Sequence, residues 1–122
     1  MNQAARSVAF VTALLALSAV IMAAMGSHMI EMSGLESLWQ TASIMHLFSA
    51  ASLLGLAALL ARLQSSLLAW GTWLIVFGTI IFCGSIYLHV ITAYVLPKVA
   101  PAGGMLMMAG WLLVALSFLR KS

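Results

Sequence analysis

The chain alternates between long apolar stretches and short polar connections. Four of the stretches are about 20 residues long, the length that a helix needs to cross a hydrocarbon layer of about 30 Å. Because lipid offers no partner to exposed backbone groups, the pattern predicts an all-α integral membrane protein with four transmembrane helices packed as one bundle. The spans are expected at about 7–26, 41–61, 67–91 and 101–119.

Composition supports a membrane location over a soluble one. Of the 122 residues, 65% are hydrophobic and only 6% are charged, whereas soluble domains carry about 25% charged residues. The length suits one four-helix transmembrane domain of residues 1–122. The net charge of +3 comes from basic residues scattered near the span ends, so we expect a lipid bilayer and no nucleic acid as partner.

The basic residues also predict an orientation. With four crossings, Arg6, Arg62, Arg120 and Lys121 lie on the side of the two termini, and only Lys98 lies on the other side. Because cytoplasmic loops carry the excess of lysine and arginine, both termini are expected in the cytoplasm.

Small residues repeat every seven positions along the spans. Between apolar helices in lipid, close approach through small side chains is a main source of specific packing. The third and fourth spans carry the clearest repeats, and the expected packing residues there are Gly71, Gly78, Gly84, Ser85, Gly103, Gly104 and Gly110. The first two spans carry looser repeats, formed by Ala5, Thr12, Ala19 and Gly26 and by Ser43, Ala50 and Ala57.

The second span is expected to have a helical extension on its outer side. The run Ser33-Gly34-Leu35-Glu36 has the spacing of a capping box, which predicts a helix start near Gly34. Trp39 is then expected in the interfacial belt of aromatic residues. The single cysteine, Cys83, lies inside the third span and is expected to be a buried, inert thiol.

Longer strings around these residues point to a family. They are Met25-Gly26-Ser27-His28, Trp39-Gln40-Thr41, Phe82-Cys83-Gly84-Ser85-Ile86-Tyr87, Pro101-Ala102-Gly103-Gly104 and Ala109-Gly110-Trp111. In this order the chain resembles the YgdD-like family of small four-span membrane proteins, a domain-of-unknown-function family. The resemblance implies a multi-pass protein of the bacterial inner membrane without an established activity. Where that family tends to carry tyrosine, glutamine and histidine, this chain has Met45, His46 and Ser49.

Histidines and methionines gather in the outer half of the predicted spans. An ionisable group at such depth is costly enough to suggest a function, but a neutral histidine also snorkels or bonds to a neighbouring helix. Imidazole and thioether groups together suit Cu(I), whereas methionine alone is an ordinary packing residue. We expect no cofactor, with Cu(I) as the alternative. The candidate ligands are His28, His46, His89, Met25, Met45, Met105 and Met108.

Catalysis and ion conduction have little support in the sequence. The only carboxylates, Glu31 and Glu36, lie outside the spans, and no serine or cysteine has a recognisable base motif. No span contains a carboxylate or arginine of the kind that lines ion paths. Four hydroxyl groups of the third span are expected either to line a narrow polar track or to bond to carbonyls of the preceding turn. They belong to Thr72, Thr79, Ser85 and Thr92.

These observations favour a non-enzymatic role. We expect a structural or interaction component of the membrane, acting as a homo-oligomer or as an accessory part of a larger complex. The alternative is a small transporter or a Cu(I)-handling protein that uses the outer-half histidines and methionines.

Overall fold

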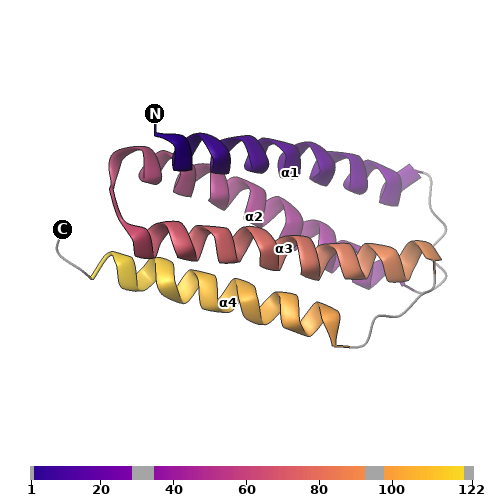
Figure 1. The fold of residues 1–122 in the computed structure, drawn as a ribbon. Coiled ribbons are helices and arrows are strands. Elements are labelled where there is room, and N and C mark those ends of the chain that lie inside the picture. Colours follow the sequence, from indigo (N-terminus) through magenta and orange to yellow (C-terminus); the bar gives the residue numbers. More distant parts are fainter. Residues whose placement is uncertain (1, 29–34, 93–97, 120–122) are drawn as a thin grey trace.

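Four helices run in alternating directions along the molecule, as Figure 1 shows. The structure is a computed structural model that describes residues 2–28, 35–92 and 98–119. The helices are α1 (Gln3–His28), α2 (Glu36–Arg62), α3 (Ser66–Thr92) and α4 (Val99–Ser117). Each is long and apolar enough to cross a membrane, and the described residues contain no strand. The predicted all-α class with four spans is therefore confirmed.

Side-chain caps fix the helix ends at one end of the molecule. The Asn2 side chain accepts a hydrogen bond from the Ala5 amide at 2.7 Å and donates one to the Leu60 carbonyl at 2.8 Å. The Ser65 hydroxyl accepts from the Leu68 amide at 3.2 Å. Since these groups satisfy the unpaired amides of a first turn, α1 begins beside the turn that joins α2 to α3 (Figure 1).

At the opposite end of the molecule, α2 and α4 begin without a side-chain hydrogen bond from their N-cap residues. α2 begins at Glu36, and Leu35 occupies the N-cap position without a side-chain hydrogen bond. The predicted capping residue Ser33 lies outside the described residues. Pro101 lies in the first turn of α4, where its missing amide proton removes no helical hydrogen bond.

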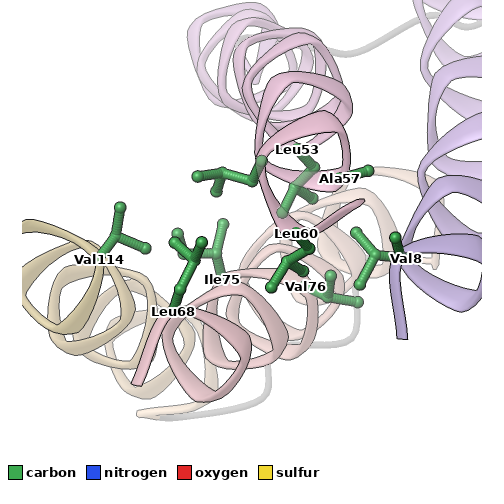
Figure 2. Packing of buried hydrophobic residues seen from close by; sticks show 10 residues of the cluster. Val8, Leu53, Ala57, Leu60, Leu68, Ile75, Val76 and Val114 are labelled. Carbon is green, nitrogen blue, oxygen red and sulfur yellow. The ribbon is translucent and has the colours of Figure 1, made fainter. Parts of the chain in front are cut away.

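α3 is the central helix of the bundle. It runs beside α2 and α4, whereas α1 packs mainly against α2 and the α4 backbone lies close to α3 alone. Figure 2 shows how the shared core is filled by side chains from all four helices, among them Val8, Leu53, Ile75 and Val114. α1 and α4 thus form the two outer members of the assembly.

Glycine pairs bring the backbones of α3 and α4 into contact. A Cβ added at Gly71 would lie 2.7 Å from the Gly110 carbonyl oxygen, and one at Gly110 would lie 2.7 Å from the Gly71 oxygen. A Cβ at Gly78 would likewise lie 2.7 Å from the Gly103 oxygen. A backbone atom cannot move aside like a flexible side chain, so this close approach requires glycine at these positions.

The other predicted packing residues lie outside this close contact. A Cβ at Gly84 would meet nothing within 4 Å, and one at Gly104 would meet only the Phe82 ring, at 3.7 Å. Ser85 is buried and donates its hydroxyl to the Phe82 carbonyl at 2.9 Å. The looser repeats of α1 and α2 supply buried positions at Ala5, Thr12, Ala19, Ala50 and Ala57.

We predict opposite effects of one added methyl group at two glycines of α3. Gly78→Ala should destabilise the protein by about 1–3 kcal/mol, because the methyl group overlaps the α4 backbone. Gly84→Ala should be neutral or stabilising by about 0.5–1 kcal/mol, because alanine is the better helix former and the position is open. Reversible unfolding in detergent measures both. Equal stability of the two variants would contradict the glycine contact.

Candidate functional site

A chain of three hydrogen-bonding side chains joins α1, α2 and α3. The Ser18 hydroxyl of α1 lies 3.0 Å from Nε2 of His46 on α2. Nδ1 of the same ring lies 3.0 Å from the hydroxyl of Tyr87 on α3. His46 and Tyr87 are each only 5% exposed. The chain therefore holds three helices together through polar groups that lie inside the bundle.

The direction of the hydrogen bonds follows from the available protons. The Ser18 hydroxyl donates its single proton to the Leu15 carbonyl at 2.9 Å. Nε2 of His46 must then carry the proton that binds Ser18, and Nδ1 accepts the proton of the Tyr87 hydroxyl. This arrangement satisfies a neutral imidazole at both nitrogens, which is the form that a bundle interior favours.

Trp39 covers this chain toward the end of the bundle. Its ring centroid lies 4.8 Å from that of Tyr87, and its indole nitrogen donates to the Met22 carbonyl at 3.0 Å. Trp39 is only 3% exposed, so its ring packs inside the bundle near the first turn of α2. The ring fits there because Gly26 has no side chain at the point of contact.

Cys83 lies on the same side of α3 as this aromatic cluster. Its thiol is buried and donates to the Ala42 carbonyl of α2 at 3.4 Å. Since the thiol is enclosed between two helices, it serves as a small packing group with a weak hydrogen bond.

The hydroxyl groups along α3 bond within their own helix. Four of them donate to a carbonyl of the preceding turn at 2.7 to 2.9 Å. The pairs are Thr72 with Leu68 at 2.8 Å, Thr79 with Ile75 at 2.8 Å, Ser85 with Phe82 at 2.9 Å and Thr92 with Leu88 at 2.7 Å. The sequence predicted either a polar track or bonds to the preceding turn for these residues, and the structure shows the bonds to the preceding turn.

The two candidate histidines whose side chains the structure describes have different surroundings. His46 faces Ser18 and Tyr87, and His89 is partly exposed further along α3. His28 is the last residue of α1, and its side chain lies outside the described part of the structure. Within the described residues, no three histidine, cysteine or acidic side chains lie close enough to hold a metal ion.

The methionines fall into two groups that share Met45. Met22, Met25 and Met45 pack against the cluster around Trp39 and Tyr87. Met45 also lines an apolar groove of about 390 Å³ between α2 and α4. Met105 is 66% exposed and lies outside the groove. The groove is lined by Met45, Phe48, Phe82, Gly104, Met107, Met108 and Trp111.

The groove exists because α4 packs along α3 alone. The α2 and α4 backbones do not come close to each other, and the rings of Phe48 and Trp111 face each other between them, with centroids 6.1 Å apart. Phe48 and Met108 are 52% and 65% exposed, so the groove opens on the outer surface of the bundle. It presents an apolar surface with a glycine, Gly104, in its wall.

Sequence reasoning singled out His46 but not its partners. Tyr87 was noted as part of a family string, and Ser18 was not singled out. The sequence signal that could have pointed to this site is that each of the first three spans contains a polar residue. Pairing them requires knowledge of which helices are neighbours and of their register.

The fold and this site define a small multi-pass membrane protein whose four apolar helices enclose a hydrogen-bonded histidine. The chain belongs to the family described as "Protein of unknown function (DUF423)", whose model matches residues 22–104. The resemblance to the YgdD-like family is thereby confirmed.

Relatives in several bacteria carry the same kind of name. A UPF0382 membrane protein of Staphylococcus epidermidis is 31% identical over 112 residues, which cover 88% of this chain and 91% of that protein. One of Staphylococcus saprophyticus is 30% identical over 108 residues, covering 85% and 89%. The UPF0382 inner membrane protein YgdD of Escherichia coli K12 is 31% identical over 105 residues, covering 83% and 80%. No solved structure matches the chain.

Two serine-to-alanine variants separate bonds between helices from bonds within one helix. Ser18→Ala should destabilise the protein by about 1 kcal/mol, because it leaves the buried His46 N–H without an acceptor. Ser85→Ala should change stability by less than about 0.5 kcal/mol, because its hydroxyl bonds only within α3. Unfolding in detergent compares them, and equal losses would argue against the chain through His46.

Proposed function

We propose that the protein is an interaction component of the bacterial inner membrane that associates with a second copy of itself through the groove between α2 and α4. We assign it no catalytic role. The observation that carries the proposal is the groove itself, an apolar recess that is left open along the side of a membrane-spanning bundle.

The composition of the groove supports a protein as its occupant. Gly104 presents no side chain toward the recess, and a Cβ added there would lie 3.7 Å from the Phe82 ring. Small residues of this kind allow a second helix to approach closely in lipid. Met45 and Met108 add flexible side chains that adapt to a partner surface. In a two-fold dimer, the exposed edge of each α4 beside the groove would enter the groove of the other copy.

The proposed orientation has both termini in the cytoplasm. Arg6 and Arg62 lie near the end of the bundle where α1 begins and α2 ends, together with the basic residues 120 and 121 in the sequence. Lys98 precedes α4 at the opposite end. The unequal distribution of positive charge supports a cytoplasmic location for the end that carries the termini.

Two leucine substitutions at open glycines test self-association. Gly104→Leu should fill the groove and shift the protein from dimer to monomer, while the fold persists because a side chain at this position meets no backbone atom. Gly84→Leu is the matched control, because it adds the same side chain to an open position on α3 outside the groove. Light scattering of the detergent-solubilised protein, corrected for bound detergent, gives the mass of each variant.

The expected result is a dimeric wild type, a dimeric Gly84→Leu variant and a monomeric Gly104→Leu variant that unfolds at the wild-type temperature. A monomeric wild type at all concentrations tested, or a dimer that survives Gly104→Leu, would rule out this interface.

A second candidate function is the handling of Cu(I), which the shared position of Met45, Met107 and Met108 along one groove favours. Thioether groups are soft ligands that suit Cu(I). Replacing Met45 and Met107 by leucine should then abolish retention of Cu(I) under reducing conditions, while Met105→Leu, outside the groove, should leave it unchanged. Wild-type protein that retains no stoichiometric copper would exclude this candidate.

A further inference from the structure

Among the buried residues that the structure describes, Thr12 and Ser49 have hydroxyl groups without a hydrogen-bond partner, in contrast to those of α3. Thr12 is 2% exposed and Ser49 is 0% exposed, and neither hydroxyl has a partner in the described part of the protein. Thr79 is equally buried but donates to the Ile75 carbonyl at 2.8 Å. An unpaired buried hydroxyl is unfavourable, and in native proteins such groups are usually satisfied by ordered water.

The helix register places these two hydroxyls at the same level. Along the antiparallel pair, Asn2 contacts Leu60 near one end, and Ser18 contacts His46 further along. Between these two contacts, Thr12 of α1 lies opposite the turn of α2 that contains Ser49. Both side chains are buried, so both belong to the interior of the bundle.

Ser49 lies one turn from His46 on the buried face of α2. The two residues are three positions apart on α2, and both are buried on its inward face. Three positions before His46, the Ser43 hydroxyl lies close to the Tyr87 hydroxyl. Hydroxyl groups therefore lie one turn to either side of the imidazole.

The neighbouring buried positions carry the smallest side chains of the interface. Ala50 of α2, next to Ser49, is 6% exposed, and Ala19 of α1, next to Ser18, is 0% exposed. Beyond Thr12, Val8, Leu53 and Leu60 belong to an apolar core cluster toward the start of α1. The polar region is thus bounded by tightly packed apolar side chains on that side.

We propose that Thr12 and Ser49 bind an internal water molecule between α1 and α2, adjacent to the hydrogen-bonded chain of His46. The water forms one hydrogen bond with each hydroxyl, as donor or as acceptor, and it links the two helices within the membrane-spanning region. The apolar packing around Val8 and Leu53 closes the site toward the cytoplasmic end of the proposed orientation, so the site is a binding site and not a conducting path.

Water-edited solid-state NMR of the full-length protein in lipid vesicles tests this directly. Magnetisation from water should reach the Thr12 and Ser49 signals as fast as it reaches residues at the helix ends. It should reach Val8 and Leu53, buried in the apolar core, several times more slowly. Equally slow transfer to all four residues would overturn the proposal.

Stability measurements on matched variants provide an independent readout. Thr12→Val and Ser49→Ala should each lower the midpoint of thermal unfolding and abolish the fast water transfer at the other residue. Their effects should be less than additive in the double variant, because both remove the same water. Thr79→Val, whose hydroxyl bonds within its own helix, is the control that leaves water transfer unchanged.

The two other physical outcomes are distinguishable and both contradict a bound water. If the hydroxyls are truly unpaired, Thr12→Val raises the midpoint, because it removes an unsatisfied polar group without changing the side-chain shape. If they rotate to bond within their own helices, the two substitutions add independently and wild-type water transfer is slow.

Discussion

The bilayer as solvent is the constraint on which this structure depends. Hydrocarbon neither hydrogen-bonds to the backbone nor drives apolar helices together, so the helices must satisfy their own polar groups and associate through close packing. Both requirements are met on α3. Its glycines at 71 and 78 meet the α4 backbone, and Tyr87 joins a hydrogen-bonded chain to α2 and α1. Removing either set of contacts would leave apolar helices with little to select one arrangement over another.

The two kinds of contact have different consequences for function. The glycine contact binds α4 so closely to α3 that the backbones of α2 and α4 remain apart, which creates the open groove. The polar chain lies between the other three helices and is enclosed by Trp39 and by apolar side chains. An exterior recess suited to a partner and an interior polar site therefore occur in one small protein, and each is altered by substitutions that leave the other intact.

Sequence patterns predicted the four helices because span length and composition are properties of single segments. They also singled out Gly71, Gly78, Gly103 and Gly110, but the pairing of these glycines across the interface emerges only from the register of α3 and α4. The same limit applied to His46: its depth marked it as unusual, whereas its partners Ser18 and Tyr87 depend on which helices are neighbours. Trp39 was expected in the interfacial belt, which tryptophan prefers, but its burial against α1 depends on the space left by Gly26, which the sequence pattern did not pair with it.

The most direct test of the account is the topology of the chain in a living membrane. Reporter proteins fused after Ser122 and inserted between α3 and α4, within residues 93–97, report the compartment that each position faces. The account predicts a cytoplasmic signal from the fusion after Ser122 and a signal from the opposite side for the inserted reporter. Signals from the same compartment at both positions would show that α4 does not cross the bilayer, which would contradict the four-span structure and the packing derived from it.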